Sequence, residues 1–302
     1  MNIGRYENSN VDGKIRNIVA TILGDGLFDD ITRICERYSE EEDDFREYDV
    51  YKIRSANGIR ILKKASEREV TNYTNYLQEH GFKVPAFYGS YKDETDIWIV
   101  IESIEGDDLR DMTNELALAA ADSLSEIQNT FWNCSDTERF DVYIERITRR
   151  YSFIKDDPII GMAYALFLER QKTCPRTLSN GDFMEFNTVG SGGKVYIIDW
   201  GFGGIMPYSL DIARFIAHAT EDRATFPFYM NNEQKKLFVD SMYKRLHEKP
   251  DFEQYIRDIK LAVLNEYVEF VEADEDEDHW YYEHAKELAK EIITTNTQKN
   301  KY

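Results

Sequence analysis

Two carboxylates and one amide stand at a spacing suited to chemistry on a phosphate. Asp182 and Asn187 lie close together in LSNGDFMEFN (residues 178–187), and Asp199 follows in VYIIDWG (residues 195–201). A carboxylate can orient an acceptor hydroxyl and take its proton, while carboxylate and amide oxygens are hard ligands for magnesium. The three side chains therefore have the chemistry needed to act on a magnesium-bound nucleotide.

The surrounding sequence indicates how these side chains come together. Asp182 and Asn187 stand in a stretch that favours an irregular loop, and Asp199 follows a short apolar strand. We expect Asp199 to project from the strand end beside that loop, within a β-rich segment at about 188–200. Both carboxylates and the amide oxygen can then converge on one site.

These motifs resemble the aminoglycoside phosphotransferase and choline kinase family of the protein-kinase-like superfamily. That family has the pattern H-G-D-x-x-x-x-N, followed by I-D-W or I-D-F. The resemblance implies that Asp182 is the catalytic base and that Asn187 and Asp199 bind Mg²⁺. It also implies that Asp211, in YSLDIA (residues 208–213), braces the catalytic loop from the start of a helix. Asn180 stands where the family usually has histidine, and we expect its amide to supply the supporting hydrogen bonds instead.

The first third of the chain holds residues that resemble the nucleotide-binding parts of the same family. Lys63, at the end of the strand motif ILK (residues 61–63), resembles the lysine that pairs with the α- and β-phosphates. Lys64 points to the other face of the strand. The expected partner of Lys63 is a helix glutamate, with Glu69 preferred and Glu67 as the alternative. Two residues apart on a helix, these glutamates cannot both face the lysine.

The segment IVIESIEG (residues 99–106) resembles the family's hinge. The resemblance implies that adenine stacks between two lobes and bonds to the backbone, through the carbonyl of Glu102 and the amide of Ile104. Backbone contacts would leave the side chains free to vary. The alternative is a simple strand that ends in a glycine turn.

Hydrophobic periodicity changes at Gly106 from sheet-rich to helical. The resemblance implies an α+β, bilobed protein-kinase-like fold. Its small antiparallel sheet lobe with one helix, residues 1–105, would bind nucleotide, with the hinge at about 102–106. A larger, mainly helical lobe, residues 106–302, would carry catalysis and substrate binding. The pattern predicts strands at 31–38, 47–55, 59–63, 85–91 and 97–104, and helices at 14–23, 66–80, 113–132, 141–153, 159–172, 232–248, 251–272 and 279–294.

Composition excludes several other classes of protein. The formal net charge is -20, with no basic cluster, which argues against binding to nucleic acid or to an anionic membrane and favours a cationic small substrate. The three cysteines are odd in number and widely spaced, which argues against a disulfide framework or a zinc site. With no apolar leader and no membrane-spanning run, the sequence predicts a cytoplasmic protein.

The family motifs do not account for two acidic runs. The run SEEEDD (residues 39–44) stands where kinases place a glycine-containing loop over the phosphates, and it contains no glycine. It favours a loop turned into solvent, although a damaged nucleotide site, as in a pseudokinase, is the competing interpretation. The run at 272–278 is read as a solvated connection between helices, or as the rim of a site for a cationic substrate.

The sequence thus predicts a small-molecule kinase. It would move the γ-phosphoryl group of ATP or GTP to a hydroxyl of a small, cationic, aminoglycoside-like molecule, with Mg²⁺ as cofactor. One alternative is a choline- or ethanolamine-type kinase. Another is a non-catalytic pseudokinase that serves as a binding module, which the acidic loop favours and the complete set of Asp182, Asn187 and Asp199 disfavours.

Overall fold

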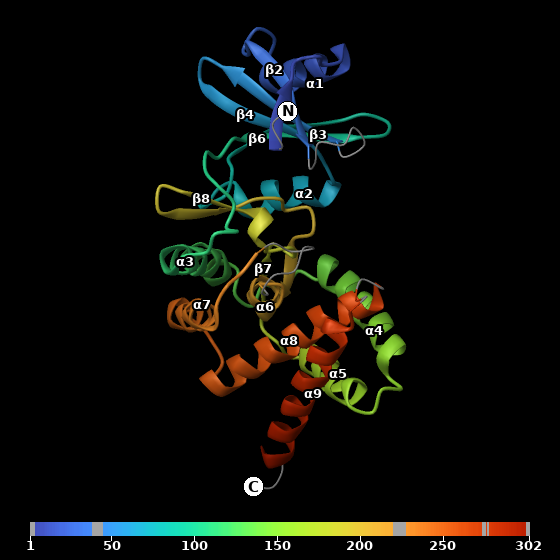
Figure 1. Cartoon of the computed structure of the whole chain (residues 1–302). Coiled ribbons are helices and arrows are strands. Elements are labelled where there is room, and N and C mark those ends of the chain that lie inside the picture. Colours follow the sequence, from blue (N-terminus) through green and yellow to red (C-terminus); the bar gives the residue numbers. More distant parts are fainter. Residues whose placement is uncertain (1–3, 38–44, 220–227, 274–275, 277, 300–302) are drawn as a thin grey trace. The chain divides into compact units, whose positions relative to one another are not determined.

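The computed structural model describes residues 4–37, 45–219, 228–273, 276 and 278–299. The chain divides into two compact units, Met1–Glu105 and Gly106–Tyr302 (Figure 1). The first is built on one antiparallel sheet and the second is mainly helical. The acidic loop expected over the phosphates, at 39–44, lies outside the described residues.

A six-stranded sheet forms the first unit. Adjacent strands are antiparallel throughout, in the spatial order β1-β2-β3-β4-β6-β5. β1 was not predicted, because its short polar sequence GRYEN lacks the apolar alternation that marks a strand. The strands are β1 (Gly4–Asn8), β2 (Asp30–Arg37), β3 (Phe45–Ser55), β4 (Gly58–Ala65), β5 (Phe87–Lys92) and β6 (Ile97–Glu102).

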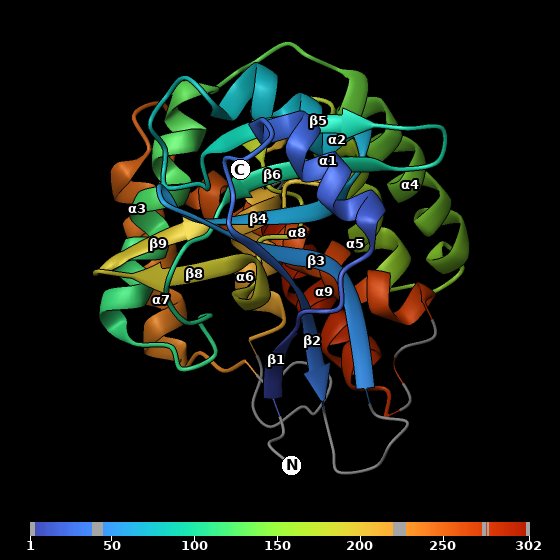
Figure 2. The ribbon, with the colours of Figure 1, turned by 90° about the horizontal axis from the view of Figure 1, so that it is seen from above.

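One face of this sheet is covered by helix α1 (Gly13–Leu23), which lies across the strands in Figure 2. Ile15, Ile18 and Val19 recur at helical spacing, so they share the face that is buried. Asp12 caps the helix by accepting a hydrogen bond from the amide of Lys14. The apolar side chains of α1 pack against those of the sheet, namely Ile31, Tyr51, Ile53, Leu62, Trp98 and Val100.

The predicted helix at 66–80 is shorter and less regular than expected. Ser66 caps α2 (Glu67–Asn72), as predicted, by accepting a hydrogen bond from the amide of Glu69. The chain then widens into a π-helical segment, η1 (Tyr73–Leu77). The amide of Gln78 donates to the carbonyl of Tyr73, five residues back, and the helix stops there.

The second unit carries seven α-helices among the described residues. Several begin at side-chain caps that the sequence offers, including Thr113, Asn231 and Asp251. α8 contacts α4, α5, α6 and α9, so it forms the centre of the unit. The helices are α3 (Asn114–Thr130), α4 (Glu138–Ile154), α5 (Ile160–Gln171), α6 (Ser209–Ala217), α7 (Asn232–Arg245), α8 (Phe252–Glu272) and α9 (Trp280–Lys299).

Two small antiparallel sheets interrupt the helices. β7 (Arg176–Ser179) pairs with β10 (Gly204–Pro207), and β8 (Thr188–Ser191) pairs with β9 (Lys194–Ile197). The expected β-rich segment at 188–200 is therefore present, although its last strand ends at Ile197. The loop that carries Asp182 runs from β7 to the short 3₁₀ helix η2 (Glu185–Asn187), which leads directly into β8.

Two further observations concern expectations from composition. The three cysteines, Cys35, Cys134 and Cys174, are free thiols. Among the described residues, no helix combines the length and the apolar content that crossing a bilayer requires.

Candidate active site

The backbone of the loop before Asp182 is held by Asp211, in the first turn of α6. The Asp211 carboxylate accepts hydrogen bonds from Ser179 Oγ at 2.7 Å and from the amides of Asn180 and Gly181 at 2.7 and 3.0 Å. Burial raises the pKa of Asp211 to about 6, although these three donors favour its charged form. The predicted brace from the start of a helix is thus present.

Gly181 allows the chain to turn into Asp182. Its φ of 78° is a left-handed conformation that glycine adopts without strain. A Cβ atom at this position would lie 2.4 Å from the carbonyl oxygen of Phe202, a backbone atom that cannot move aside easily. The glycine of the Gly-Asp motif is therefore required by close backbone packing as well as by its conformation.

Asn180, which stands in place of the family's histidine, links the loop to the strand end. Its Nδ2 donates to the carbonyls of Ile198 and Asp199 at 3.1 and 3.0 Å, and its Oδ1 accepts from the amide of Asp182 at 3.2 Å. The side chain is fully buried. Asp199 has a left-handed φ of 54°, unusual for a residue other than glycine, and this bond holds its carbonyl.

Both carboxylate oxygens of Asp182 are engaged. Oδ2 accepts from Asn187 Nδ2 at 2.9 Å. Oδ1 accepts from two atoms of Arg214, Nη2 at 2.7 Å and Nε at 3.1 Å. The Asp182 side chain remains 24% exposed, so a solute can still reach it. The structure therefore places Asp182 beside Asn187 and adds Arg214, which was not predicted.

The oxygens near this loop suit magnesium. Asn187 uses its Nδ2 to donate to the carbonyl and carboxylate of Asp182, which leaves its amide oxygen available as a ligand. Within the described residues no three His, Cys, Asp or Glu side chains gather as a self-contained metal cage. Magnesium at phosphotransfer sites needs only one or two protein oxygens, because nucleotide phosphates and water complete its shell. Asn187 and Asp199 fit that arrangement.

In the first unit, the structure pairs Lys63 with Glu69 and not with Glu67. Lys63 Nζ lies 3.0 Å from Glu69 Oε1, and the two side chains are 15% and 2% exposed. Glu67 instead forms an ion pair with Lys92 on the surface. Lys64, on the opposite face of β4, lies 2.8 Å from Asp96. The binding of nucleotide phosphates by Lys63 stays a prediction.

The predicted hinge follows β6. The amide of Glu102 donates to the carbonyl of Ala86 at 2.8 Å, and the Glu102 carboxylate accepts from the Ala86 amide at 3.1 Å. These bonds fix the end of β6 against the segment before β5. The contacts proposed for adenine, with the Glu102 carbonyl and the Ile104 amide, stay a prediction.

Residues 46–236 match the model of the phosphotransferase enzyme family, APH. This match covers more than half of the chain, and it includes Lys63, Asp182, Asn187 and Asp199. The chain belongs to the phosphotransferase enzyme family. No curated protein shows significant sequence similarity to this phosphotransferase.

Solved structures share the fold at low sequence identity. An ethanolamine kinase from Plasmodium vivax has a TM-score of 0.56 and 11% identity, covering 82% of this chain and 78% of its own. Amicoumacin kinase hAmiN, in complex with AMP-PNP, Ca²⁺ and Ami, has a TM-score of 0.57 and 15% identity, and the match covers 82% of this chain and 85% of the kinase. An aminoglycoside phosphotransferase from Alicyclobacillus acidocaldarius has a TM-score of 0.55 and 11% identity, and the match covers 94% of this chain and 95% of that protein. The prediction of an α+β, protein-kinase-like fold is confirmed.

Two charged residues near Asp182, Arg214 and Glu185, were not predicted from the sequence. Arg214 lies three residues after Asp211, so on a helix both belong to one face, and this spacing was the available signal. Glu185 lies inside the Asp-x-x-x-x-Asn motif, is fully buried, and has no hydrogen-bond partner for either carboxyl oxygen among the described residues. Burial raises the pKa of Glu185 to about 7. Nothing in its sequence position indicated that burial.

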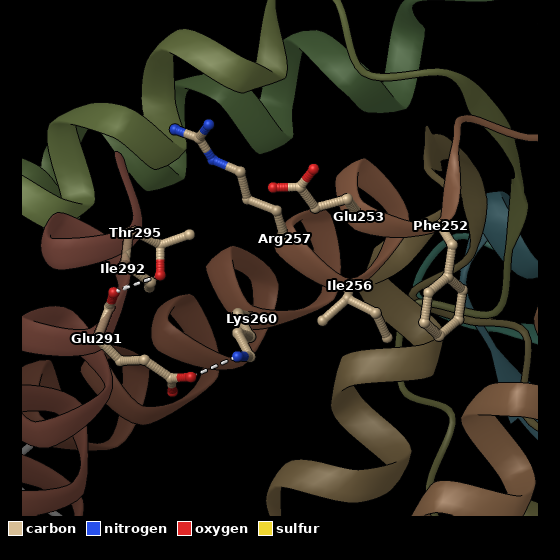
Figure 3. A pocket seen from close by; sticks show the side chains of 8 residues that line it. All are labelled: Phe252, Glu253, Ile256, Arg257, Lys260, Glu291, Ile292 and Thr295. Carbon is tan, nitrogen blue, oxygen red and sulfur yellow. Dashed lines mark hydrogen bonds and ion pairs between the residues drawn. The ribbon is translucent and has the colours of Figure 1, made fainter. Parts of the chain in front are cut away.

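The phosphotransferase also has an apolar hollow that is unrelated to the predicted site residues. It has a volume of about 280 Å³ and is lined by side chains of α8 and α9, which Figure 3 shows around the ion pair of Lys260 with Glu291. None of the predicted catalytic, metal or nucleotide residues lines it. The acidic run at 272–278 lies partly outside the described residues. Its Asp276 accepts hydrogen bonds from the amides of Tyr281 and Tyr282.

Proposed function

We propose that this protein transfers the γ-phosphoryl group of ATP or GTP to a hydroxyl group of a small molecule. The single observation that carries the proposal is the arrangement around Asp182. The Asp182 carboxylate is partly exposed and accepts hydrogen bonds at both oxygens, one of them from the candidate magnesium ligand Asn187. Asp211 holds the backbone of the same loop. Membership of the phosphotransferase family supports the same reaction.

Asp182 would orient the acceptor hydroxyl and take its proton. The acceptor oxygen forms a bond to the γ-phosphorus while the bond from that phosphorus to the β–γ bridging oxygen breaks. The nucleoside diphosphate leaves with the bonding electron pair, and the proton of the hydroxyl passes to the Asp182 carboxylate. Most of the rate enhancement in such transfers comes from positioning and from charge stabilisation, which rigid side chains provide.

Asn187 and Asp199 would hold the metal, and Lys63 the nucleotide phosphates. When bound, Mg²⁺ neutralises charge on the phosphates. Glu69 is buried and fixes Lys63 by an ion pair, so the ammonium group is oriented before any nucleotide arrives. The backbone at Glu102 and Ile104 would bind the adenine.

The proposed acceptor is a small cation, such as an aminoglycoside or an amino alcohol. A net charge of -20 attracts cations and repels anions. The structural neighbours include an ethanolamine kinase and an aminoglycoside phosphotransferase, which supports an acceptor of this class. AMP-PNP in the amicoumacin kinase complex supports ATP as a donor. A choline- or ethanolamine-type kinase is the second form of the same proposal.

The test is magnesium-dependent turnover of ATP and GTP with a panel of aminoglycosides, amino alcohols and sugars. Removing a general base typically costs about 10²–10⁴-fold in rate, so we expect Asp182→Asn to lose turnover by that factor. Asp122→Asn is the matched control, because Asp122 is an exposed residue of the same unit that pairs with Arg245. Its turnover should equal that of the wild type.

Two results would contradict the enzyme proposal. In one, no acceptor raises turnover above that of Asp182→Asn, and neither nucleotide binds in the presence of magnesium. In the other, Asp182→Asn is as active as Asp122→Asn. Nucleotide binding without transfer to any member of the panel would favour the pseudokinase alternative.

A further inference from the structure

Arg214 connects Asp182 to a buried acidic residue of a different helix. On one side its Nη2 and Nε donate to Asp182 Oδ1, at 2.7 and 3.1 Å. On the other side its Nη1 donates to Glu266 Oε2 at 2.7 Å. Glu266 lies on α8, the central helix of the unit, so the guanidinium bridges the loop of Asp182 to the core of the unit.

Of the inner pair, Glu266 is buried and Arg214 is mostly shielded from solvent. The side chains of Arg214 and Glu266 are 18% and 7% exposed. Burial alone would raise the pKa of Glu266, but Arg214 and His218 together hold it well below its usual range. A buried charge without a partner is strongly unfavourable, so neither Arg214 nor Glu266 can leave its position without a large cost.

Glu266 Oε2, the oxygen that accepts from Arg214, is also contacted by His218. His218 Nε2 lies 3.3 Å from Glu266 Oε2, and His218 Nδ1 lies 3.3 Å from the hydroxyl of Tyr281. Burial lowers the pKa of His218, which favours the neutral form of the imidazole. The chain of contacts therefore runs from Asp182 through α6 and α8 to α9.

α6 holds the catalytic loop at two points on one face. Asp211 binds the loop backbone at Asn180 and Gly181. Arg214, three residues further along the same helix, binds the side chain of Asp182. Residues three apart on a helix project from the same side, so a rigid helix sets the distance between these two contacts.

An aspartate needs such contacts to adopt one orientation. The torsion that turns its carboxylate is broad, so the side chain alone does not select a rotamer for the carboxylate plane. A carboxylate has about four acceptor positions, two on each oxygen. Arg214 fills both positions on Asp182 Oδ1, and Asn187 fills one on Oδ2. Among the contacts of the described residues, one position remains, and it is on Oδ2.

We propose that Arg214, anchored by Glu266, is a positioning residue that turns the Asp182 carboxylate so that Oδ2 receives the proton of the acceptor hydroxyl. This inference rests on the proposed role of Asp182 as the base. Arg214 acts through Asp182 and does not itself contact the reacting atoms. The proposal names Asp182 Oδ2 as the atom that takes the proton and Arg214 as the residue that selects this atom.

Two variants test the proposal, since loss of Arg214 alone would leave the buried Glu266 carboxylate without its guanidinium partner. Arg214→Lys keeps the charge but cannot span both carboxylates with a fork of donors. Arg214→Met combined with Glu266→Gln removes the positive and the negative charge together. The matched control is Arg170→Met combined with Asp258→Asn, because Arg170 forms a comparable ion pair with buried Asp258, is 20% exposed, and has no contact with Asp182.

We expect both Arg214 variants to lose about 10²-fold in kcat, the typical effect of a displaced catalytic group, with KM for ATP nearly unchanged. The control, Arg170→Met combined with Asp258→Asn, should keep the wild-type kcat.

Crystal structures of the wild type and the Arg214→Met/Glu266→Gln variant with magnesium and AMP-PNP give a second, independent result. The proposal requires one orientation of the Asp182 carboxylate in the wild type and a rotated or divided one in that variant. An unchanged Asp182 in the Arg214→Met/Glu266→Gln variant would overturn it, as would a kcat for the Arg214 variants equal to that of the control. Failure of the proposed function would appear differently, as equal turnover of Asp182→Asn and the wild type, and the crystal structures would still decide on Arg214.

Discussion

Replacing Asn180 with alanine should loosen the active-site loop by an amount that the structure allows us to work out. The side-chain amide of Asn180 makes three hydrogen bonds. It donates to the carbonyls of Ile198 and Asp199 and accepts from the backbone amide of Asp182. The side chain is fully buried, so water cannot readily replace it. At about 1 kcal/mol for each bond, Asn180→Ala should lower the free energy of unfolding by about 3 kcal/mol.

The same change should weaken magnesium-dependent nucleotide binding. Asn180 holds the carbonyl of Asp199, whose left-handed φ of 54° costs about 1–2 kcal/mol for an ordinary residue. Without that bond the backbone can relax, and the Asp199 carboxylate moves with it. Asn180→His, which restores the family's usual residue, should recover part of the loss because a neutral imidazole offers one donor.

Urea unfolding and calorimetric titration of AMP-PNP, with and without magnesium, would measure both effects. Asn129→Ala is the matched control. The Asn129 amide also makes two bonds to backbone atoms, at Arg245 and His247, so this variant should lose about 2 kcal/mol of stability without any change in nucleotide binding. Unfolding of Asn180→Ala at the wild-type urea concentration would contradict the stabilising role of these three bonds. Equal nucleotide binding by Asn180→Ala and Asn129→Ala would contradict the link from Asn180 to Asp199.

Two further predictions concern the same loop. Glu185 has an ordinary pKa of 4.5 and a pKa of about 7 when folded, so the folded state binds the extra proton between these values and stability falls as pH rises from 4.5 to 7. At pH 8 the free energy of unfolding of Glu185→Gln should therefore exceed that of the wild type by up to about 3 kcal/mol, and near pH 4 the two should be similar. Urea unfolding at both pH values measures this difference, and an equal difference at the two would contradict the prediction. Gly181→Ala should destabilise the protein by more than about 2 kcal/mol, because the new Cβ meets the Phe202 carbonyl at a left-handed φ. An unchanged melting temperature would exclude that clash.

Local signals in the sequence were sufficient for much of the fold and for the centre of the site. The predicted strands of the first unit and the long helices of the second are present, because alternation and helical periodicity report burial directly. Asp182, Asn187 and Asp199 lie within a short stretch, so their motif could be read without tertiary information. The preference for Glu69 over Glu67 as the partner of Lys63 agrees with the ion pair that the structure contains.

The features that escaped prediction depend on distant contacts. Arg214 and Glu266 are separated by a long stretch of chain and meet only because α6 packs on α8. β7 and β10 are strands of four residues, too short to show a period. Glu185 looks like a surface residue in sequence, and only the packing of the loop shows that it is buried.

The two adjacent lysines of β4 have a consequence for how the sheet assembles. Lys63 and Lys64 point to opposite faces, one toward Glu69 and the other toward Asp96. A slip of β4 by one residue would exchange the two faces, carry Leu62 out of the core beneath α1 and direct the Lys63 charge into it. It would also leave buried Glu69 without its ammonium partner. The residue proposed to bind phosphate thus also penalises misregistered pairing during folding, so the native strand alignment is selected by electrostatics as well as by apolar packing.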